Sequence, residues 1–280
     1  PAVVLQGMTA GVNDVAFTCD AAQVIAAGCD KSLHVWDAAS GRHRHTLTGH
    51  SAGVSGVAGS PLDARLAVSI SEDRSFKLWD LSKGFAVRSV PCAKMPLSLA
   101  LSGDGNTVVT GHLDGSVLLW DVRQCRAGAA APLLETRDQS QPLVALATLP
   151  SHDSCLLLAA RDGTVRLWDF RGASLMKLVR HPAFALGVAG GSGRPRCRLG
   201  VSPDGRLLAA GGADGGVWVW DLRHAGGSGA AAEPRQLRGG RHSGGGGGGS
   251  PAAGGGGPVA HREAVVAAAF SADMSCLVSG

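Results

Sequence analysis

An aspartate followed six residues later by a tryptophan, which is itself followed by an aspartate, occurs five times in this chain. The copies are Asp30…Trp36-Asp37, Asp73…Trp79-Asp80, Asp114…Trp120-Asp121, Asp162…Trp168-Asp169 and Asp214…Trp220-Asp221. Successive tryptophans of the set are 43, 41, 48 and 52 residues apart, and only Trp218 of the six tryptophans stands elsewhere. Such a period indicates a fold built from repeated units.

A repeat of about 40–45 residues is typical of a β-propeller with four strands in each blade. In the second copy, the short apolar run Leu66–Ile70 predicts a buried strand, and Asp73 supplies a carboxylate that can cap the following turn. Alternation along the next strand places Phe76 and Leu78 on one face and Trp79 on the other. The sequence therefore predicts an all-β fold of radially stacked four-stranded sheets.

With these residues the chain resembles the WD-repeat propeller family. The resemblance implies a hydrogen-bonded support in each blade, made by the turn Asp, a His from a preceding Gly-His pair, a Ser or Thr, and the Trp. The second blade matches the whole set with His50, Asp73, Trp79 and either Ser69 or Ser71. The other blades keep only the carboxylate and the indole, namely Asp30, Asp114, Asp162, Asp214, Trp36, Trp120, Trp168 and Trp220. We therefore expect the support to be complete once and partial elsewhere.

The chain is interpreted as one propeller domain over residues 1–280, incomplete at both ends. Five blades are complete, and Leu277–Gly280 resembles the second strand of a sixth. At about 40–45 residues per blade, we expect a complete ring of seven. The segment 225–258 is dominated by Gly, Ala and Ser, which predicts a disordered insertion with an outer strand near Arg235–Leu237.

Composition argues against several classes of function. The net charge is only +4 and the basic residues are scattered, whereas a nucleic-acid interface needs a concentrated basic face. The seven cysteines form no C-x-x-C pair, which favours reduced thiols in a cytoplasmic protein without a metal site. No apolar run approaches the ~20 residues of a membrane span, and no signal peptide is recognised. We expect no cofactor.

A more specific resemblance follows from the order of several motifs. They are the run Arg44–Ser51, the pair Gly111-His112, the stretch Trp120–Arg123 and the turn Val201–Gly205. Taken in this order from about Leu5 to Gly280, they resemble the C-terminal propellers of the autophagy-related protein 16 family. The resemblance implies a non-catalytic scaffold that helps to direct lipidation of a ubiquitin-like autophagy protein to membranes during autophagosome assembly. It also implies a cytoplasmic protein recruited to autophagic membranes, whose partners are the conjugation machinery, receptors or membrane-associated proteins.

In a WD propeller, the residue just before each turn Asp projects toward one rim. These residues are Cys29, Glu72, Leu113, Arg161 and Ala213. Glu72, Leu113 and Arg161 would offer two opposite charges and an apolar contact on neighbouring blades. They are the candidate partner-binding residues, although solvated turn residues would show the same pattern.

Two alternatives remain open at this point. Three copies end in Trp-Asp-x-Arg, with Arg123, Arg171 and Arg223, and such endings resemble the box by which WD-repeat substrate receptors dock on a cullin-RING ubiquitin ligase. An enzyme is disfavoured, because the Ser, His and Asp around His50 and Asp73 follow the structural Trp spacing. His43 and His45 share one face of an expected outer strand and could touch a metal, but no third ligand is evident.

Overall fold

The computed structural model describes residues 4–127, 131–137, 141–149, 152–170, 174–180, 198–212, 215–222, 235–237, 265, 267–271, 273–274 and 276–279. The expected rim residue Ala213, the turn residue Asp214, and Arg171 and Arg223 lie outside these ranges. The predicted insertion 225–258 also lies outside them, except for residues 235–237.

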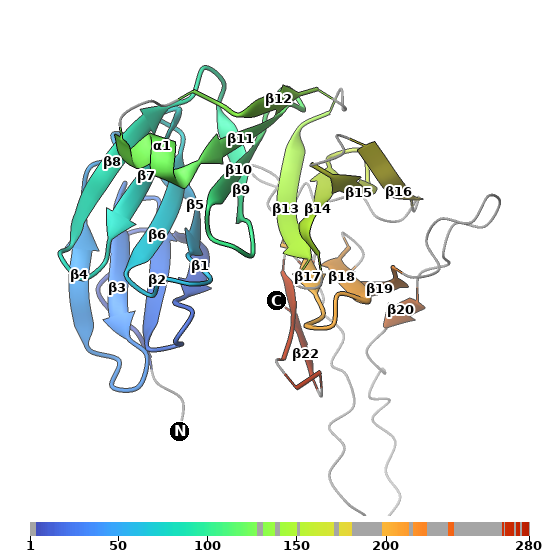
Figure 1. Ribbon diagram of the computed structural model, residues 1–280. Helices are drawn as coiled ribbons and strands as arrows, with labels where there is room; N and C mark the ends of the chain where they lie inside the picture. Colours follow the sequence, from blue (N-terminus) through green and yellow to red (C-terminus); the bar gives the residue numbers. More distant parts are fainter. Residues whose placement is uncertain are drawn as a thin grey trace, which may run out of the picture.

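Five four-stranded antiparallel sheets follow one another along the chain, and Figure 1 shows them side by side. We number them as blades 1 to 5. Their strands are β1 (Val12–Phe17), β2 (Gln23–Gly28), β3 (Leu33–Asp37) and β4 (His43–Leu47); β5 (Val54–Gly59), β6 (Leu66–Ser71), β7 (Ser75–Asp80) and β8 (Phe85–Pro91); β9 (Pro96–Leu101), β10 (Thr107–His112), β11 (Val117–Asp121) and β12 (Leu134–Thr136); β13 (Leu143–Leu149), β14 (His152–Ala160), β15 (Thr164–Asp169) and β16 (Ser174–Arg180); β17 (Gly200–Val201), β18 (Leu207–Gly211), β19 (Val217–Asp221) and β20 (Arg235–Leu237).

A two-stranded sheet of β21 (Ala268–Phe270) and β22 (Leu277–Ser279) follows blade 5. The expected outer strand at 235–237 is present as β20, paired with β19. In the described part of the chain the one helix is the short α1 (Val122–Ala127) after β11. None of the described helical residues forms a segment long and apolar enough to span a bilayer.

The first strands of the blades run in the same direction around a common centre. Asn13 Nδ2 donates to the Val54 carbonyl over 2.6 Å, and Asp14 Oδ2 accepts from the Val57 amide over 2.9 Å. Successive residues of β1 thus contact successive positions of β5, and the two strands are parallel. Residues of β1, β5, β9 and β13 line a central cavity of about 890 Å³. Because the first strands are parallel, the turns between the second and third strands of blades 1 to 4 lie at the same rim.

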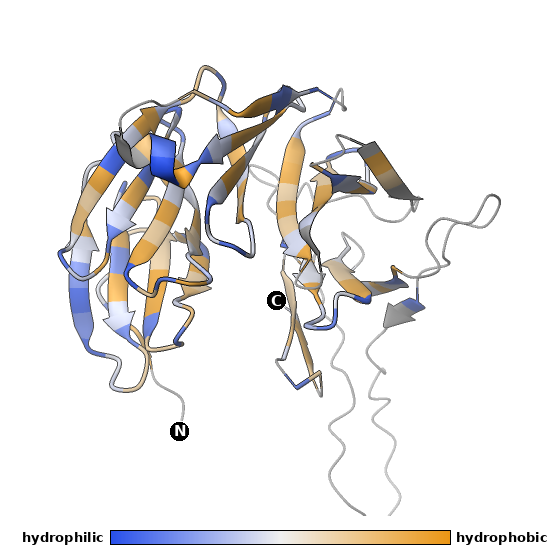
Figure 2. Cartoon of the chain, viewed as in Figure 1, coloured by the Kyte–Doolittle hydropathy of each residue, from blue (hydrophilic) through white to orange (hydrophobic). Residues whose placement is uncertain are grey.

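Packing between blades follows the predicted alternation. Phe76 and Leu78 join the cluster shared by blades 2 and 3, where the ring of Phe76 meets that of Trp120 edge to face at 5.2 Å. Trp79, on the other face of β7, packs among Ile25 and Val35 of blade 1. The prediction for these three side chains is confirmed. Figure 2 shows apolar residues concentrated in the inner and middle strands, whereas the outer strand β4 is almost entirely hydrophilic.

Candidate functional site

The turn after the second strand has one construction in the first four blades. The carboxylate of Asp30, Asp73, Asp114 or Asp162 accepts a hydrogen bond from the backbone amide and another from the hydroxyl of the Ser or Thr two residues ahead. The residue that directly follows the aspartate in the chain has a positive φ, between 59° and 81°. In blades 1 to 5 this residue is Lys31, Arg74, Gly115, Gly163 and Gly215. These carboxylates fix the shape of each turn through local bonds.

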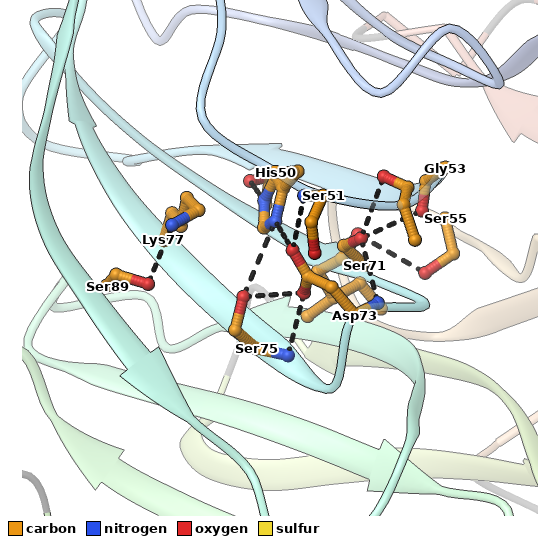
Figure 3. Close-up of polar contacts among 12 residues, drawn as sticks. His50, Ser51, Gly53, Ser55, Ser71, Asp73, Ser75, Lys77 and Ser89 are labelled. Carbon is orange, nitrogen blue, oxygen red and sulfur yellow. Dashed lines mark hydrogen bonds and ion pairs between the residues drawn. The ribbon is translucent and has the colours of Figure 1, made fainter.

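Blade 2 contains a continuous buried chain of hydrogen bonds beneath its turn. His50 Nδ1 lies 2.8 Å from Asp73 Oδ2, and Figure 3 shows this contact between His50 and the turn. His50 Nε2 lies 2.8 Å from Ser69 Oγ, and Trp79 Nε1 donates to the same Ser69 oxygen over 2.8 Å. The hydroxyl of the set is therefore Ser69. Ser71 instead donates to the carbonyls of Ala52 and Gly53.

The chemistry of the groups assigns the protons in this chain. A carboxylate can only accept, so neutral His50 carries its hydrogen on Nδ1 and offers the Nε2 lone pair. Ser69 then donates its hydroxyl hydrogen to His50 and accepts from the Trp79 indole. Burial lowers the pKa of His50, although the bond to Asp73 opposes this. Burial pushes the pKa of Asp73 upward, but hydrogen bonds from Ser75, His50 and Ser51 outweigh it and leave that pKa below its usual value.

Ser69, His50 and Asp73 thus have the connectivity of a nucleophile, a base and an orienting carboxylate. However, Ser69 and Trp79 have no exposed surface, and the His50 side chain is fully buried. No substrate can approach the Ser69 oxygen, which already accepts from the Trp79 indole. The geometry makes this a structural support for the turn.

Blade 3 holds the same indole and carboxylate in another way. Trp120 Nε1 donates to Thr110 Oγ1 over 3.0 Å, and the same oxygen lies 2.9 Å from Nε2 of His112, which comes from β10 rather than from the connection between blades. Asp114 is held from outside by Lys94, whose Nζ lies 2.9 Å from Asp114 Oδ2 and 2.7 Å from Glu135 Oε1. Burial alone would raise the pKa of Asp114, but bonds from Ser116 and Lys94 lower it to about 2.

Blade 1 shows a third arrangement. Ala26 stands where blades 2 and 3 have a hydroxyl, and Trp36 Nε1 donates instead to the backbone carbonyl of Gln6 over 3.0 Å. His34 of β3 supports the turn, with Nε2 3.0 Å from Ser32 Oγ and 3.3 Å from Asp30 Oδ2. The resemblance to the family placed the histidine in a Gly-His pair before the first strand of a blade. It therefore gave no supporting role to His34, or to His112 of the pair Gly111-His112, which lies in β10.

Blades 4 and 5 have apolar residues at the hydroxyl position, Leu158 and Ala210. Their tryptophans Trp168 and Trp220 are nevertheless buried, in the clusters that blade 4 shares with its two neighbouring blades. The carboxylate and indole positions are thus common to the repeat, whereas the groups that connect them differ from blade to blade.

The candidate rim residues occupy one equivalent backbone position. Cys29, Glu72, Leu113 and Arg161 donate their amides, over 2.9–3.2 Å, to the carbonyls of Gly11, Gly53, Met95 and Pro142 respectively. Cys29, Leu113 and Arg161 are exposed, Leu113 at 50%, while Glu72 is half-buried. The structure therefore brings these four turns to the same rim of four consecutive blades. In each blade the hydrogen bond joins the turn to the residue just before the first strand.

Other candidate chemistry is limited. Arg123 is exposed in α1, and its amide donates to Asp121 over 2.7 Å. Among the described residues no group of three or more His, Cys, Asp or Glu side chains could hold a metal ion. The six cysteines that the structure describes are free thiols, and burial raises the pKa of Cys92 to about 12, so that thiol is unreactive.

The sequence matches the family model described as "WD domain, G-beta repeat" over residues 1–37, 41–80, 88–121, 133–169 and 196–221. It is 36% identical to Autophagy-related protein 16 of Arabidopsis thaliana over 78% of this chain and 40% of that protein. It is 30% identical to Protein tipD of Dictyostelium discoideum over 78% of this chain and 34% of that protein. It is 28% identical to Nuclear distribution protein PAC1 of Arthroderma otae over 79% of this chain and 52% of that protein. The chain thus spans at most about half the length of these relatives.

Proposed function

The chain belongs to the family of WD40-repeat propellers, and from this premise we propose that it is a non-catalytic protein-interaction scaffold of the autophagy-related protein 16 type. In that role it would help to direct lipidation of a ubiquitin-like autophagy protein to membranes during autophagosome formation. It would act from the cytoplasm and associate with membranes through its partners. The observation that carries the proposal is the similarity to the Arabidopsis protein over 78% of the chain, together with the order of motifs noted in the sequence.

The rim gives the scaffold a physical basis. Backbone bonds and capped carboxylates fix the turns that hold Cys29, Glu72, Leu113 and Arg161, so a partner would meet side chains in a preformed arrangement. Preformed surfaces lose little conformational entropy on binding, and this favours affinity from a small contact area. We propose Leu113 as an apolar anchor, flanked by the charges of Glu72 and Arg161 on neighbouring blades. Ala213 would add the equivalent position of blade 5.

The buried Ser69–His50–Asp73 chain supports the non-catalytic part of the proposal, since its nucleophile position is closed to solvent. An alanine at Ser69 should therefore change stability, with no loss of a reaction.

The proposal is tested in cells that lack their own autophagy-related protein 16 and receive the natural protein that carries this chain. We expect lipidation of the ubiquitin-like protein to be restored, and proximity labelling to recover autophagy proteins. Leu113→Asp should reduce recruitment to membranes, whereas Leu62→Asp, at another apolar residue with 71% exposure outside these turns, should not. Full recruitment of the Leu113 variant would contradict the assigned rim, and absence of any lipidation with the unmodified protein would contradict the adaptor role.

A substrate receptor of a cullin-RING ligase is the second candidate, favoured by the exposure of Arg123 after Trp120-Asp121. It predicts that the ligase adaptor is recovered in the same labelling experiment and is lost with Arg123→Ala. Retention of autophagy proteins by Arg123→Ala would favour the first candidate.

A further inference from the structure

Two histidines of blade 1 face each other across neighbouring strands. His34 Nδ1 of β3 lies 3.3 Å from His43 Nε2 of β4, and the two ring centres are 5.4 Å apart. The indole of Trp36 lies beside both, with ring centres 5.6 Å from His34 and 5.7 Å from His43. His34 is buried, whereas His43 is exposed, so the pair is anchored on one side and reachable from solvent on the other.

The turn of blade 1 sets the tautomer of His34. Its Nε2 lies against Asp30 Oδ2 and Ser32 Oγ. Because the carboxylate only accepts, neutral His34 carries its hydrogen on Nε2 and presents the Nδ1 lone pair toward His43. A histidine whose second nitrogen donates to a carboxylate is the arrangement that orients imidazole ligands of metals.

The spacing of the two nitrogens also suits a shared ion. Zinc–nitrogen bonds of about 2.0–2.1 Å at a tetrahedral angle place two ligand nitrogens about 3.3–3.4 Å apart. The observed separation is 3.3 Å.

We propose that His34 and His43 form a two-histidine site for a borderline divalent transition-metal ion of the Zn²⁺ type, with water in the remaining positions. His43 binds through Nε2 and carries its hydrogen on Nδ1 when the ion is present. Thr46 Oγ1, which lies 3.2 Å from His43 Nε2, is placed to hydrogen-bond a metal-bound water. With two protein ligands, the site would exchange its metal readily, in contrast to a closed structural zinc centre.

His45 does not share this face, contrary to the sequence-based expectation. A register shift between Val35 and Trp36 pairs His45 with Val35 and His43 with Trp36. His45 therefore turns toward blade 2, where its ring lies against Gly84. The bulge separates the two histidines, and it makes His45 a matched control on the same strand.

The site is tested by calorimetric titration of untagged protein with Zn²⁺, supported by quenching of tryptophan fluorescence with Cu²⁺. We expect one saturable site whose affinity for Zn²⁺ falls at least about tenfold in His43→Ala. Loss of an outer-shell partner alone typically lowers metal affinity by about 10–100-fold, so loss of a direct ligand should cost at least as much. His43→Gln should behave in the same way, and His45→Ala should bind as the unmodified chain does. Circular dichroism establishes that each variant is folded.

Absence of saturable Zn²⁺ binding by the unmodified chain would overturn the proposal. Equal losses in the His43 and His45 variants would overturn it as well, because they would indicate non-specific histidine binding. Neither result depends on the proposed scaffold function, which is measured by recruitment in cells.

Discussion

Blades 2 and 3 solve one structural problem with different chemistry. In both, a buried indole donates to a hydroxyl, Ser69 or Thr110, and a turn carboxylate caps the residue two ahead. In blade 2 a histidine joins the hydroxyl to the carboxylate inside the protein. In blade 3 the histidine reaches only the hydroxyl, and the carboxylate is held from the surface by Lys94.

The difference shows which parts of the repeat are interchangeable. The carbonyls of Gly53 and Met95 accept the equivalent turn amides of blades 2 and 3, so these two residues correspond. His50 lies three residues before Gly53, and the residue three before Met95 is the buried Cys92, which makes no hydrogen bond to Asp114. His112 fills part of that role from the strand. Its Nδ1 is buried with no hydrogen bond of good geometry among the described residues. Blade 2 should therefore depend on its histidine more strongly than blade 3 does.

The largest expected effect comes from the feature that the two blades share. Ser69→Ala and Thr110→Val each leave an indole N–H and a histidine nitrogen buried without their partner, and each unsatisfied group costs about 1–3 kcal/mol. We expect both variants to lower the free energy of unfolding by about 2–4 kcal/mol, measured by denaturant titration. Ser89→Ala, an exposed serine that accepts from Lys77, should change it by less than about 0.5 kcal/mol. A small effect in only one of the two blades would show that their hydroxyls are not equivalent.

The next effect separates the two histidines. His50→Leu removes the acceptor of the Ser69 hydroxyl and one donor to Asp73, and we expect a loss of about 2–3 kcal/mol. His112→Leu removes the ring that pairs with Thr110, but the Thr110 hydroxyl keeps the Leu118 carbonyl as an acceptor at 3.4 Å, so we expect a loss of less than about 1 kcal/mol. Unfolding of both variants in denaturant gives the comparison. Equal losses would mean that the bridge to Asp73 contributes nothing beyond packing.

Much of this arrangement could be predicted from sequence, and the exceptions have physical causes. Strict alternation gave the faces of Phe76 and Trp79, because an uninterrupted strand has a period of two. The same rule misplaced His45, because a bulge opposite Val35 and Trp36 leaves Arg44 as an extra residue in β4.

His34 and His112 could have been found by another signal. Ser32 and His34, and likewise Thr110 and His112, stand two residues apart, and this spacing places a hydroxyl and an imidazole on one face of a strand. The choice of Ser69 over Ser71 could not be made from spacing, since both lie on that face of β6. It depends on the carbonyls of Ala52 and Gly53, which engage Ser71.

The dependence of stability on pH tests a property in which the two blades agree. Burial lowers the pKa values of both His50 and His112 in the folded protein. Between the usual histidine pKa of about 6.5 and these lower values, the unfolded chain binds more protons than the folded one. Stability is therefore fully present above about pH 7 and declines as the pH falls through this window.

The decline that each histidine contributes grows with the difference between its pKa in the folded and in the unfolded chain. His50→Gln and His112→Gln should each flatten the profile between about pH 7 and pH 5, and unfolding measured across this range checks it. Asp73 and Asp114 do not contribute there, because their lowered pKa values place the loss of their stabilisation at more acidic pH. An unchanged slope in both variants would assign the pH dependence to other histidines, such as His43, whose pKa is also lowered.

The smallest effect concerns the surface support of blade 3. Lys94 is 35% exposed and bridges Asp114 and Glu135, and exposed ion pairs contribute about 0.2–1 kcal/mol. Lys94→Met should cost an amount in this range at low salt. The cost should vanish in about 1 M salt, where charges are screened within about 3 Å. The buried bridge of blade 2 is protected from ions, so the cost of His50→Leu should be the same at both salt concentrations. If the cost of Lys94→Met persisted in about 1 M salt, the Lys94 ion pairs would be as well shielded from salt as the buried His50 bridge. The proposed difference between a surface support in blade 3 and a buried one in blade 2 would then be wrong.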